Sequence, residues 1–188
     1  MPEVGPVVGG LLISGVIKEG DTLQIGPLDD GSFSGVHVVS VQRHKVACRV
    51  VRAGQSATLA LNSNDNLSLD RSLRKGMVVI EASNQKYSHS VCLYFQARIH
   101  VLFHATTIYP GFQTTVYIGN VRQTAILIAI MGKKCISTND SASVMFRFMK
   151  QPEYINPGCR LLFREGPSKG IGRVLQVFPL KSDKNNNF

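Results

Sequence analysis

Apolar and polar residues alternate along much of the chain, and the clearest case is VCLYFQARIHVLFH at residues 91–104. Every second position of its first thirteen residues is apolar: Val91, Leu93, Phe95, Ala97, Ile99, Val101 and Phe103. A period of two places alternate side chains on opposite faces of a strand. This stretch therefore predicts a long strand with one face in a core and the other toward water.

Shorter stretches show the same alternation: GVHVVSVQR, ATLAL, TTVYIGN, TAILIAI and SVMFRFMK. Between the strands lie clusters of turn-forming residues: KEGD, PLDDGS, RAGQ, YPGF and NPG. No segment has a helical period with caps. Many short strands with frequent turns predict an all-β chain built from sandwiches or barrels.

The polar stretch EASNQKYSHS at residues 81–90 interrupts the alternation and predicts a domain boundary. Residues 1–82 and 91–180 are each long enough for a small barrel or sandwich, with 83–90 as the linker. The low-complexity end KSDKNNNF, residues 181–188, predicts a disordered tail.

Charge differs between the two predicted domains. The net charge is +9, from 21 Lys and Arg against 12 Asp and Glu, and the part through Lys86 contributes only +1 of it. The part from Tyr87 onward carries +8. A basic half suggests a polyanion partner, and a solubilising charge without a partner is the alternative.

One glycine-rich stretch, LLFREGPSKGIGRV at residues 161–174, invites comparison with a phosphate-binding loop. Such a loop needs Ser or Thr after its lysine, whereas Gly170 follows Lys169. Pro167 has no N–H to donate. The stretch instead predicts a β-hairpin with a tight basic turn.

Residues with catalytic or metal-binding chemistry do not form a recognisable constellation, so we expect no enzymatic or metal site in this chain. On a strand, His100 and His104 lie about 13 Å apart, too far to chelate one ion. The aromatic residues Phe146 and Phe148 alternate as core residues do, which favours packing over base stacking.

Cellular location is predicted from what the chain lacks. It has no apolar run long enough for a membrane span, and its start has no signal-peptide pattern. Its four cysteines are far apart and read as reduced thiols. We expect a cytoplasmic protein without membrane contact.

A resemblance to a known family emerges from motifs in the right order. VGPVVGGLLISGVIKEGDTLQIGP resembles the opening of domain II of translational GTPases of the elongation-factor Tu and 1α class. VRAGQSATLAL and SLRKGMVVIEA match later landmarks of that barrel, and FREGPSKGIGRV resembles the closing hairpin of domain III. IGNVRQTA, FRF, PEY and FREG most resemble the GTP-binding protein 1/2 branch. The resemblance implies two consecutive antiparallel β-barrels.

The resemblance also implies that nucleotide binding belongs to a different domain. The guanine-nucleotide domain that precedes domain II in this family is not in this sequence. We therefore expect a non-catalytic, RNA- and ribosome-engaging half of a larger GTPase, of the aminoacyl-tRNA delivery or ribosome-rescue type. GTP and magnesium then belong to its own upstream domain, and tRNA and the ribosome are the expected partners.

Family members suggest candidate RNA-binding residues. The resemblance implies that the first barrel holds the aminoacylated 3′ end of tRNA, through Gly5, Val7, Gln42 and Lys45. It implies that the second barrel grips the T-stem backbone, through Arg122, Arg164, Gly166, Lys169 and Arg173. Two alternatives stay open: Arg164 and Glu165 only pair with each other, or the barrels are a protein-interaction module for a translation or rescue factor.

Overall fold

The structure of the protein, a computed structural model, describes residues 5–63, 70–82 and 90–180, and these are almost entirely strands, turns and loops. Helical geometry within this part is confined to residues 70–72 and Ser90. The predicted all-β fold class of two antiparallel barrels is confirmed. The predicted tail and all of the predicted linker except Ser90 lie outside the described residues.

The chain forms two compact units that do not follow a single cut in the sequence. The first unit comprises residues 1–26, 33–73 and 79–85. The second comprises the chain from residue 86 onward together with two short earlier segments, 27–32 and 74–78. Residues 27–32 and 74–78 are therefore packed as parts of the second unit.

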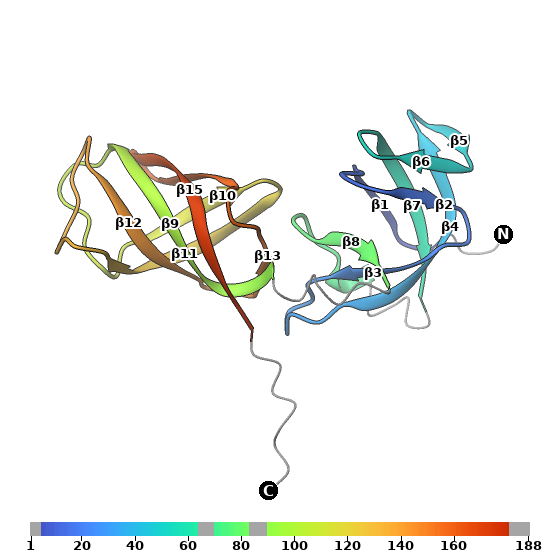
Figure 1. Cartoon of the computed structure of the whole chain (residues 1–188), viewed down its shortest axis with the longest axis horizontal. Coiled ribbons are helices and arrows are strands. Elements are labelled where there is room, and N and C mark those ends of the chain that lie inside the picture. Colours follow the sequence, from blue (N-terminus) through green and yellow to red (C-terminus); the bar gives the residue numbers. More distant parts are fainter. Residues whose placement is uncertain (1–4, 64–69, 83–89, 181–188) are drawn as a thin grey trace, which may run out of the picture. The chain divides into compact units, whose positions relative to one another are not determined.

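Strands β1 to β8 build the barrel of the first unit (Figure 1). They are β1 (Val7–Leu11), β2 (Val16–Lys18), β3 (Thr22–Gly26), β4 (Ser34–Arg43), β5 (Val46–Cys48), β6 (Val50–Arg52), β7 (Ser56–Asn62) and β8 (Val78–Glu81). The main sheet has the order β1-β7-β4-β3-β8, with β5 paired to β4, and β2 and β6 form a two-stranded ribbon. Its core contains apolar residues of these strands, among them Leu23, Val36, Val38, Val41 and Leu61.

A closed six-stranded antiparallel barrel forms the second unit (Figure 1). Its strands are β9 (Val91–Phe103), β10 (Gln113–Ile118), β11 (Val121–Ile130), β12 (Ser141–Phe148), β14 (Arg160–Glu165) and β15 (Ser168–Pro179), with the short β13 (Glu153–Tyr154) on β9. The order β12-β11-β10-β14-β15-β9 returns to β12, so each of the six strands is paired on both sides. Closure removes the unpaired edges of this sheet.

Phenylalanine rings fill the second barrel. Phe95, Phe146, Phe148 and Phe163 are each at most 1% exposed. The centroid of the Phe95 ring lies 5.5 Å from that of Phe146 and 5.0 Å from that of Phe148. Phe146 and Phe148 are thus core residues, as the alternation predicts, and neither offers a face to a nucleic-acid base.

Strand β9 follows the predicted alternation over most of its length, with Ala97, Ile99 and Val101 buried. The prediction is wrong at Phe103, which is 42% exposed. Lys169 of β15 lies opposite Phe103 while Gly170 lies opposite Val101, so β9 has an extra residue at this point. This bulge breaks the period of two, as an inserted residue does in a ladder.

A buried polar network ties the segment 74–78 into the second unit. Nη1 of Arg74 donates to Oε2 of Glu153 at 2.6 Å, and its Nη2 donates to the carbonyl oxygens of Pro27 and Pro152. Nε2 of Gln123 donates to Oε1 of Glu153 at 2.7 Å. Every carboxylate oxygen of Glu153 thus has a donor, which is what a buried charge requires.

Candidate nucleic-acid interface

The β14–β15 hairpin carries four of the candidate residues: Arg164, Gly166, Lys169 and Arg173. Gly166 and Pro167 form its two-residue loop, between the paired residues Glu165 and Ser168. Gly166 has a φ of 54°, which costs glycine nothing, and proline holds a negative φ at the next position. A positive φ followed by a negative one is the pattern of a type II′ turn, whose twist suits a hairpin. The predicted hairpin is confirmed.

Alternate residues of the hairpin point outward from the barrel. Among the residues paired between the two strands, these are Arg160, Leu162 and Arg164 on β14, and Lys169, Ile171 and Arg173 on β15. Glu165, which adjoins the loop, is exposed as well. The register pairs Arg164 with Lys169, Leu162 with Ile171, and Arg160 with Arg173. Residues that are directly opposite share a face of the sheet. The outer face therefore consists of successive rows of one chemical kind, cationic, apolar and cationic.

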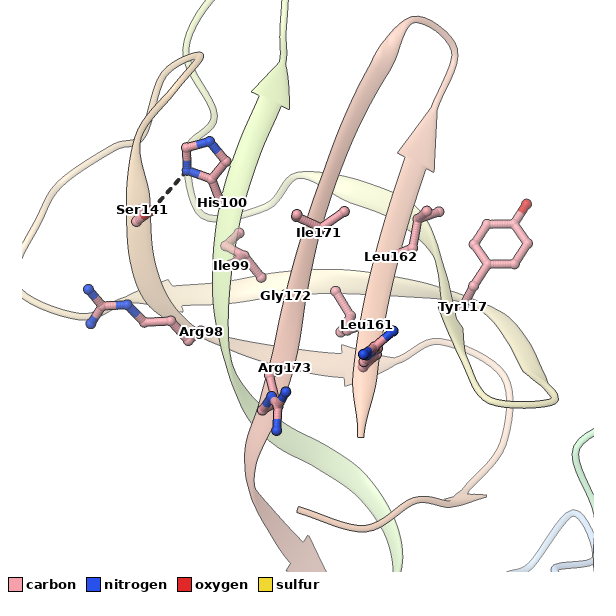
Figure 2. Close-up of a pocket in the computed structure, with 11 residues that line it drawn as sticks. Arg98, Ile99, His100, Tyr117, Ser141, Leu161, Leu162, Ile171, Gly172 and Arg173 are labelled. Carbon is pink, nitrogen blue, oxygen red and sulfur yellow. Dashed lines mark hydrogen bonds between the residues drawn. The ribbon is translucent and has the colours of Figure 1, made fainter. Parts of the chain in front are cut away.

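We call the row that contains Arg160 and Arg173 the arginine row, and Arg98 of β9 extends it. Arg173 lies opposite Arg160 on one side and opposite Arg98 of β9 on the other. Like charges that face each other across strands destabilise a sheet unless something neutralises them. Figure 2 shows the side chains of Arg98 and Arg173 extending in different directions from their strands.

The second row, which we call the apolar row, consists of Ile171, Leu162 and Tyr117, on β15, β14 and β10. Ile171 is 46% and Leu162 45% exposed. The row runs along a shallow groove of about 720 Å³ that the arginine row also lines, with His100 at its β9 end (Figure 2). Nδ1 of His100 lies 2.9 Å from Oγ of Ser141.

Arg122, the fifth candidate in the second unit, lies beside the apolar row. It is directly opposite Tyr117 in the β10–β11 pair, and its guanidinium carbon is 5.6 Å from the centre of the Tyr117 ring. A guanidinium over an aromatic face is an attractive arrangement. The structure therefore places Arg122 beside Tyr117, which lines the groove, although Arg122 itself is not part of the lining.

The cations of the hairpin and Arg98 have no carboxylate partner among the described residues, because the paired carboxylates of the second unit contact other side chains. Asp140 pairs with Lys133, and Glu153 pairs with Arg74. A backbone hydrogen bond from Ser137 and the Lys133 ammonium lower the pKa of Asp140. No ion pair joins Arg164 to Glu165, or any cation of the hairpin to a carboxylate, among the described residues. The pairing alternative for Arg164 and Glu165 is therefore not what the structure contains.

The four candidates of the first unit lie around β7. Val7 on β1 is 57% exposed and Gln42 on β4 is exposed, and the pairing through β7 puts them on one face of the sheet. Lys45 lies in the two-residue turn after β4, with a φ of 67°. A Cβ on Gly5 would collide with the carbonyl oxygen of Leu61, so packing alone requires glycine there.

Sequence reasoning missed Arg98 and Arg160. Arg160 follows from the hairpin register once the loop is fixed at Gly166 and Pro167, because residues at equal distances from the loop face each other. Arg98 is on the outward face that the alternation of β9 predicts, but its pairing with Arg173 depends on a ladder between distant segments.

The described part of the chain offers little support for a metal site. His104 Nδ1 lies 2.7 Å from Oγ of Ser168, and His100 contacts a different serine, so the two histidines face separate partners. Within the residues that the structure covers, no three His, Cys, Asp or Glu side chains are grouped to hold a metal ion. No helix in that part has the length and apolarity to cross a membrane.

Comparison of the sequence with known proteins matches the chain to a family. Residues 5–80 match the family described as elongation factor Tu domain 2. Over 94% of its length the chain is 52% identical to GTP-binding protein 2 of Mus musculus and of Homo sapiens, and spans 28% of each. It is 39% identical over 98% of its length to GTP-binding protein 1 of Xenopus laevis, of which it spans 27%. The predicted resemblance is confirmed, and the chain spans less than a third of these relatives.

Proposed function

Because residues 5–80 belong to the elongation factor Tu domain 2 family, we propose that this chain is the RNA-engaging half of a translational GTPase. In this proposal the β14–β15 hairpin contacts the RNA backbone. The partners are tRNA and the ribosome, and GTP and magnesium bind a separate domain of the parent protein. One observation carries it. Five cations without a carboxylate partner in the described residues lie on three adjacent strands: Arg98, Arg160, Arg164, Lys169 and Arg173.

The chemistry of these side chains suits phosphate. Guanidinium groups donate two parallel N–H···O bonds to phosphate oxygens, and four of the five cations are arginines. Backbone N–H groups bind phosphate as well, and Gly166 at the hairpin tip is exposed. Such contacts recognise helical RNA by shape and backbone, so binding is expected to be independent of tRNA species.

A double substitution at the hairpin, Lys169→Gln with Arg173→Gln, tests the proposal. Binding to tRNA should weaken uniformly across tRNA species, and each lost phosphate contact should reduce the salt slope by about 0.7–0.9. Thermal unfolding should barely change, because exposed cations contribute about 0.5 kcal/mol or less. Filter binding over a range of salt concentrations measures both the affinity and the slope.

The matched control removes the same charge elsewhere on the barrel. Lys134 and Lys150 are exposed and lie outside the groove, so Lys134→Gln with Lys150→Gln should leave most of the affinity intact. If the hairpin variant binds tRNA with unaltered affinity and slope, the hairpin is structural only. The protein-interaction alternative then replaces the RNA proposal.

The first barrel has a separate part in the proposal, which is to hold the aminoacylated 3′ end near Val7 and Gln42. Both are on one face of the sheet beside β7, next to the turn that carries Lys45. Aminoacylated tRNA should then bind more tightly than deacylated tRNA, and Gln42→Ala should reduce that difference. Equal affinity for the two forms of tRNA would remove this part of the proposal.

A further inference from the structure

The apolar row has cations on both of its sides, and contact with an RNA backbone leaves it unused. Ile171 and Leu162 line the groove and expose nearly half of their aliphatic side chains. The arginine row flanks them on one side within the groove. Arg164 with Lys169 flanks them on the other side, where these two cations line a neighbouring hollow that shares Leu162. A ligand that covers the apolar row and both flanking cationic rows must be apolar along its middle and anionic along both edges.

The spacing of the rows matches an α-helix laid across the strands. Neighbouring strands are about 4.8 Å apart, so successive members of the apolar row are separated by close to the 5.4 Å pitch of a helix. Lys169 and Arg173 are four residues apart on β15, which separates the two cationic rows by about 13 Å. A helix with its side chains is about 10–12 Å wide, so its two flanks reach both rows.

From this match we propose that the groove binds an acidic amphipathic α-helix of a partner protein. Its apolar stripe packs on Ile171, Leu162 and Tyr117, and carboxylates on its two flanks meet the arginine row and the Arg164–Lys169 pair. Helix-in-groove recognition places such anchors at positions i, i+3 or i+4, and i+7. The proposal goes beyond the RNA contact, because it requires a protein ligand and the apolar row.

RNA suits the groove less well than a helix does. A sugar–phosphate backbone laid over Ile171 and Leu162 would lose water from polar groups without gaining hydrogen bonds, which is costly. Stacking of bases needs planar aromatic faces. Ile171 and Leu162 are aliphatic, and the guanidinium of Arg122 already lies over the ring of Tyr117. Arginines beside large apolar side chains are instead the composition typical of protein interfaces.

Groove length sets the size of the helix and the strength of binding. From His100 to Tyr117 the groove crosses four strands, β9, β15, β14 and β10, or about 14 Å. About ten helical residues cover that distance. A contact of this size is smaller than stable interfaces, so we expect micromolar rather than nanomolar affinity.

A designed peptide tests the proposal with the whole chain. The probe is a fluorescent acidic helix of about 14 residues with leucines at i, i+4 and i+7 and glutamates on both flanks. The control peptide has the same composition, but its leucines do not form an apolar stripe. Fluorescence anisotropy should give micromolar binding of the first peptide and at least tenfold weaker binding of the second.

Substitutions in the chain then locate the site. Ile171→Ser should weaken binding of the striped peptide at least fivefold, with Leu162→Ser as a second variant should the first fail to fold. The matched control is Ile128→Ser, because Ile128 on β11 is 41% exposed and lies outside the groove. Its peptide affinity should equal that of the unsubstituted chain, and circular dichroism checks that each variant is folded.

Any of three results would overturn the proposal. The chain could bind the two peptides equally, or the folded variants Ile171→Ser and Leu162→Ser could both bind the striped peptide as tightly as the unsubstituted chain does. In the third result, Ile171→Ser would weaken binding of a double-stranded RNA oligonucleotide as much as it weakens binding of the striped peptide. The last result would assign the groove to RNA. Failure of the RNA proposal is recognised separately, since it depends on tRNA binding by the Lys169 and Arg173 variant.

Discussion

At the scale of single residues, the pair formed by Arg74 and Glu153 makes the stability of the second unit depend on pH. Burial of the Glu153 side chain raises the pKa of its carboxyl above the ordinary value of 4.5, and hydrogen bonds from Arg74 and Gln123 partly oppose this. A raised pKa in the folded state means that the contribution of Glu153 to stability is complete below pH 4.5. That contribution is lost as pH rises through the folded pKa.

Removal of the cation should make this dependence visible. Arg74→Met leaves an ionised Glu153 buried without its partner and raises its pKa further, so the free energy of unfolding at pH 7 should fall by about 3 kcal/mol. The loss should shrink as pH falls toward 4.5 and Glu153 binds a proton. Urea denaturation at several pH values measures it.

Two variants control for that experiment. Lys133→Met removes one partner of an exposed ion pair and should change stability at pH 7 far less than Arg74→Met does. Adding Glu153→Gln to Arg74→Met removes the uncompensated charge and should recover much of the loss. A loss in Arg74→Met that stays constant with pH would show that Glu153 does not carry the effect.

At the scale of elements, two glycines allow β15 to lie close against β9 behind the groove. A Cβ on Gly172 would collide with the carbonyl oxygen of Arg98, and a Cβ on Gly170 would collide with the ring of Phe163. Neither glycine has a positive φ, so the requirement is space rather than backbone conformation. Because Gly170 and Gly172 lack side chains, β15 can pack closely against its neighbours, and this packing positions the outward rows of the hairpin.

Gly172→Ala should therefore destabilise the chain by about 1–3 kcal/mol, the usual cost of overpacking, because the obstacle is backbone and cannot turn aside. Gly35→Ala is the control, since Gly35 is in strand β4 and nothing lies within 4 Å of its added Cβ. Thermal unfolding should show a lower midpoint for the first variant and an equal or higher one for the second. Equal midpoints would mean that β15 shifts at no cost.

The same elements show how far sequence patterns reach. The period of two in β9 and the glycine-rich stretch at residues 161–174 are local features, and they predicted the strand and the hairpin correctly. The loop itself is shorter than the predicted basic turn, because Arg164 and Lys169 are paired within the strands. The exposure of Phe103 and the arginine row escaped prediction. Both depend on how β15 pairs with β9 far away in the sequence, and that ladder shifts its register at three places.

At the scale of the whole molecule, composition and motif order predicted the all-β class and the family, because strand period and turn residues recur along the entire chain. The boundary between the units was harder to predict. Segments 27–32 and 74–78 belong to the second unit through contacts such as those of Arg74, and no local pattern marks such contacts.

The most direct test of the RNA proposal maps the contact itself on the intact chain. Amide chemical shifts of the isotopically labelled chain would be followed while a tRNA acceptor–T-stem minihelix is added. We expect the largest changes at Arg164, Gly166, Lys169 and Arg173, with smaller ones at Arg98 and Arg160 on the same face. Changes confined to strands outside this face, such as β11 and β12, or no changes at saturating RNA, would contradict the account.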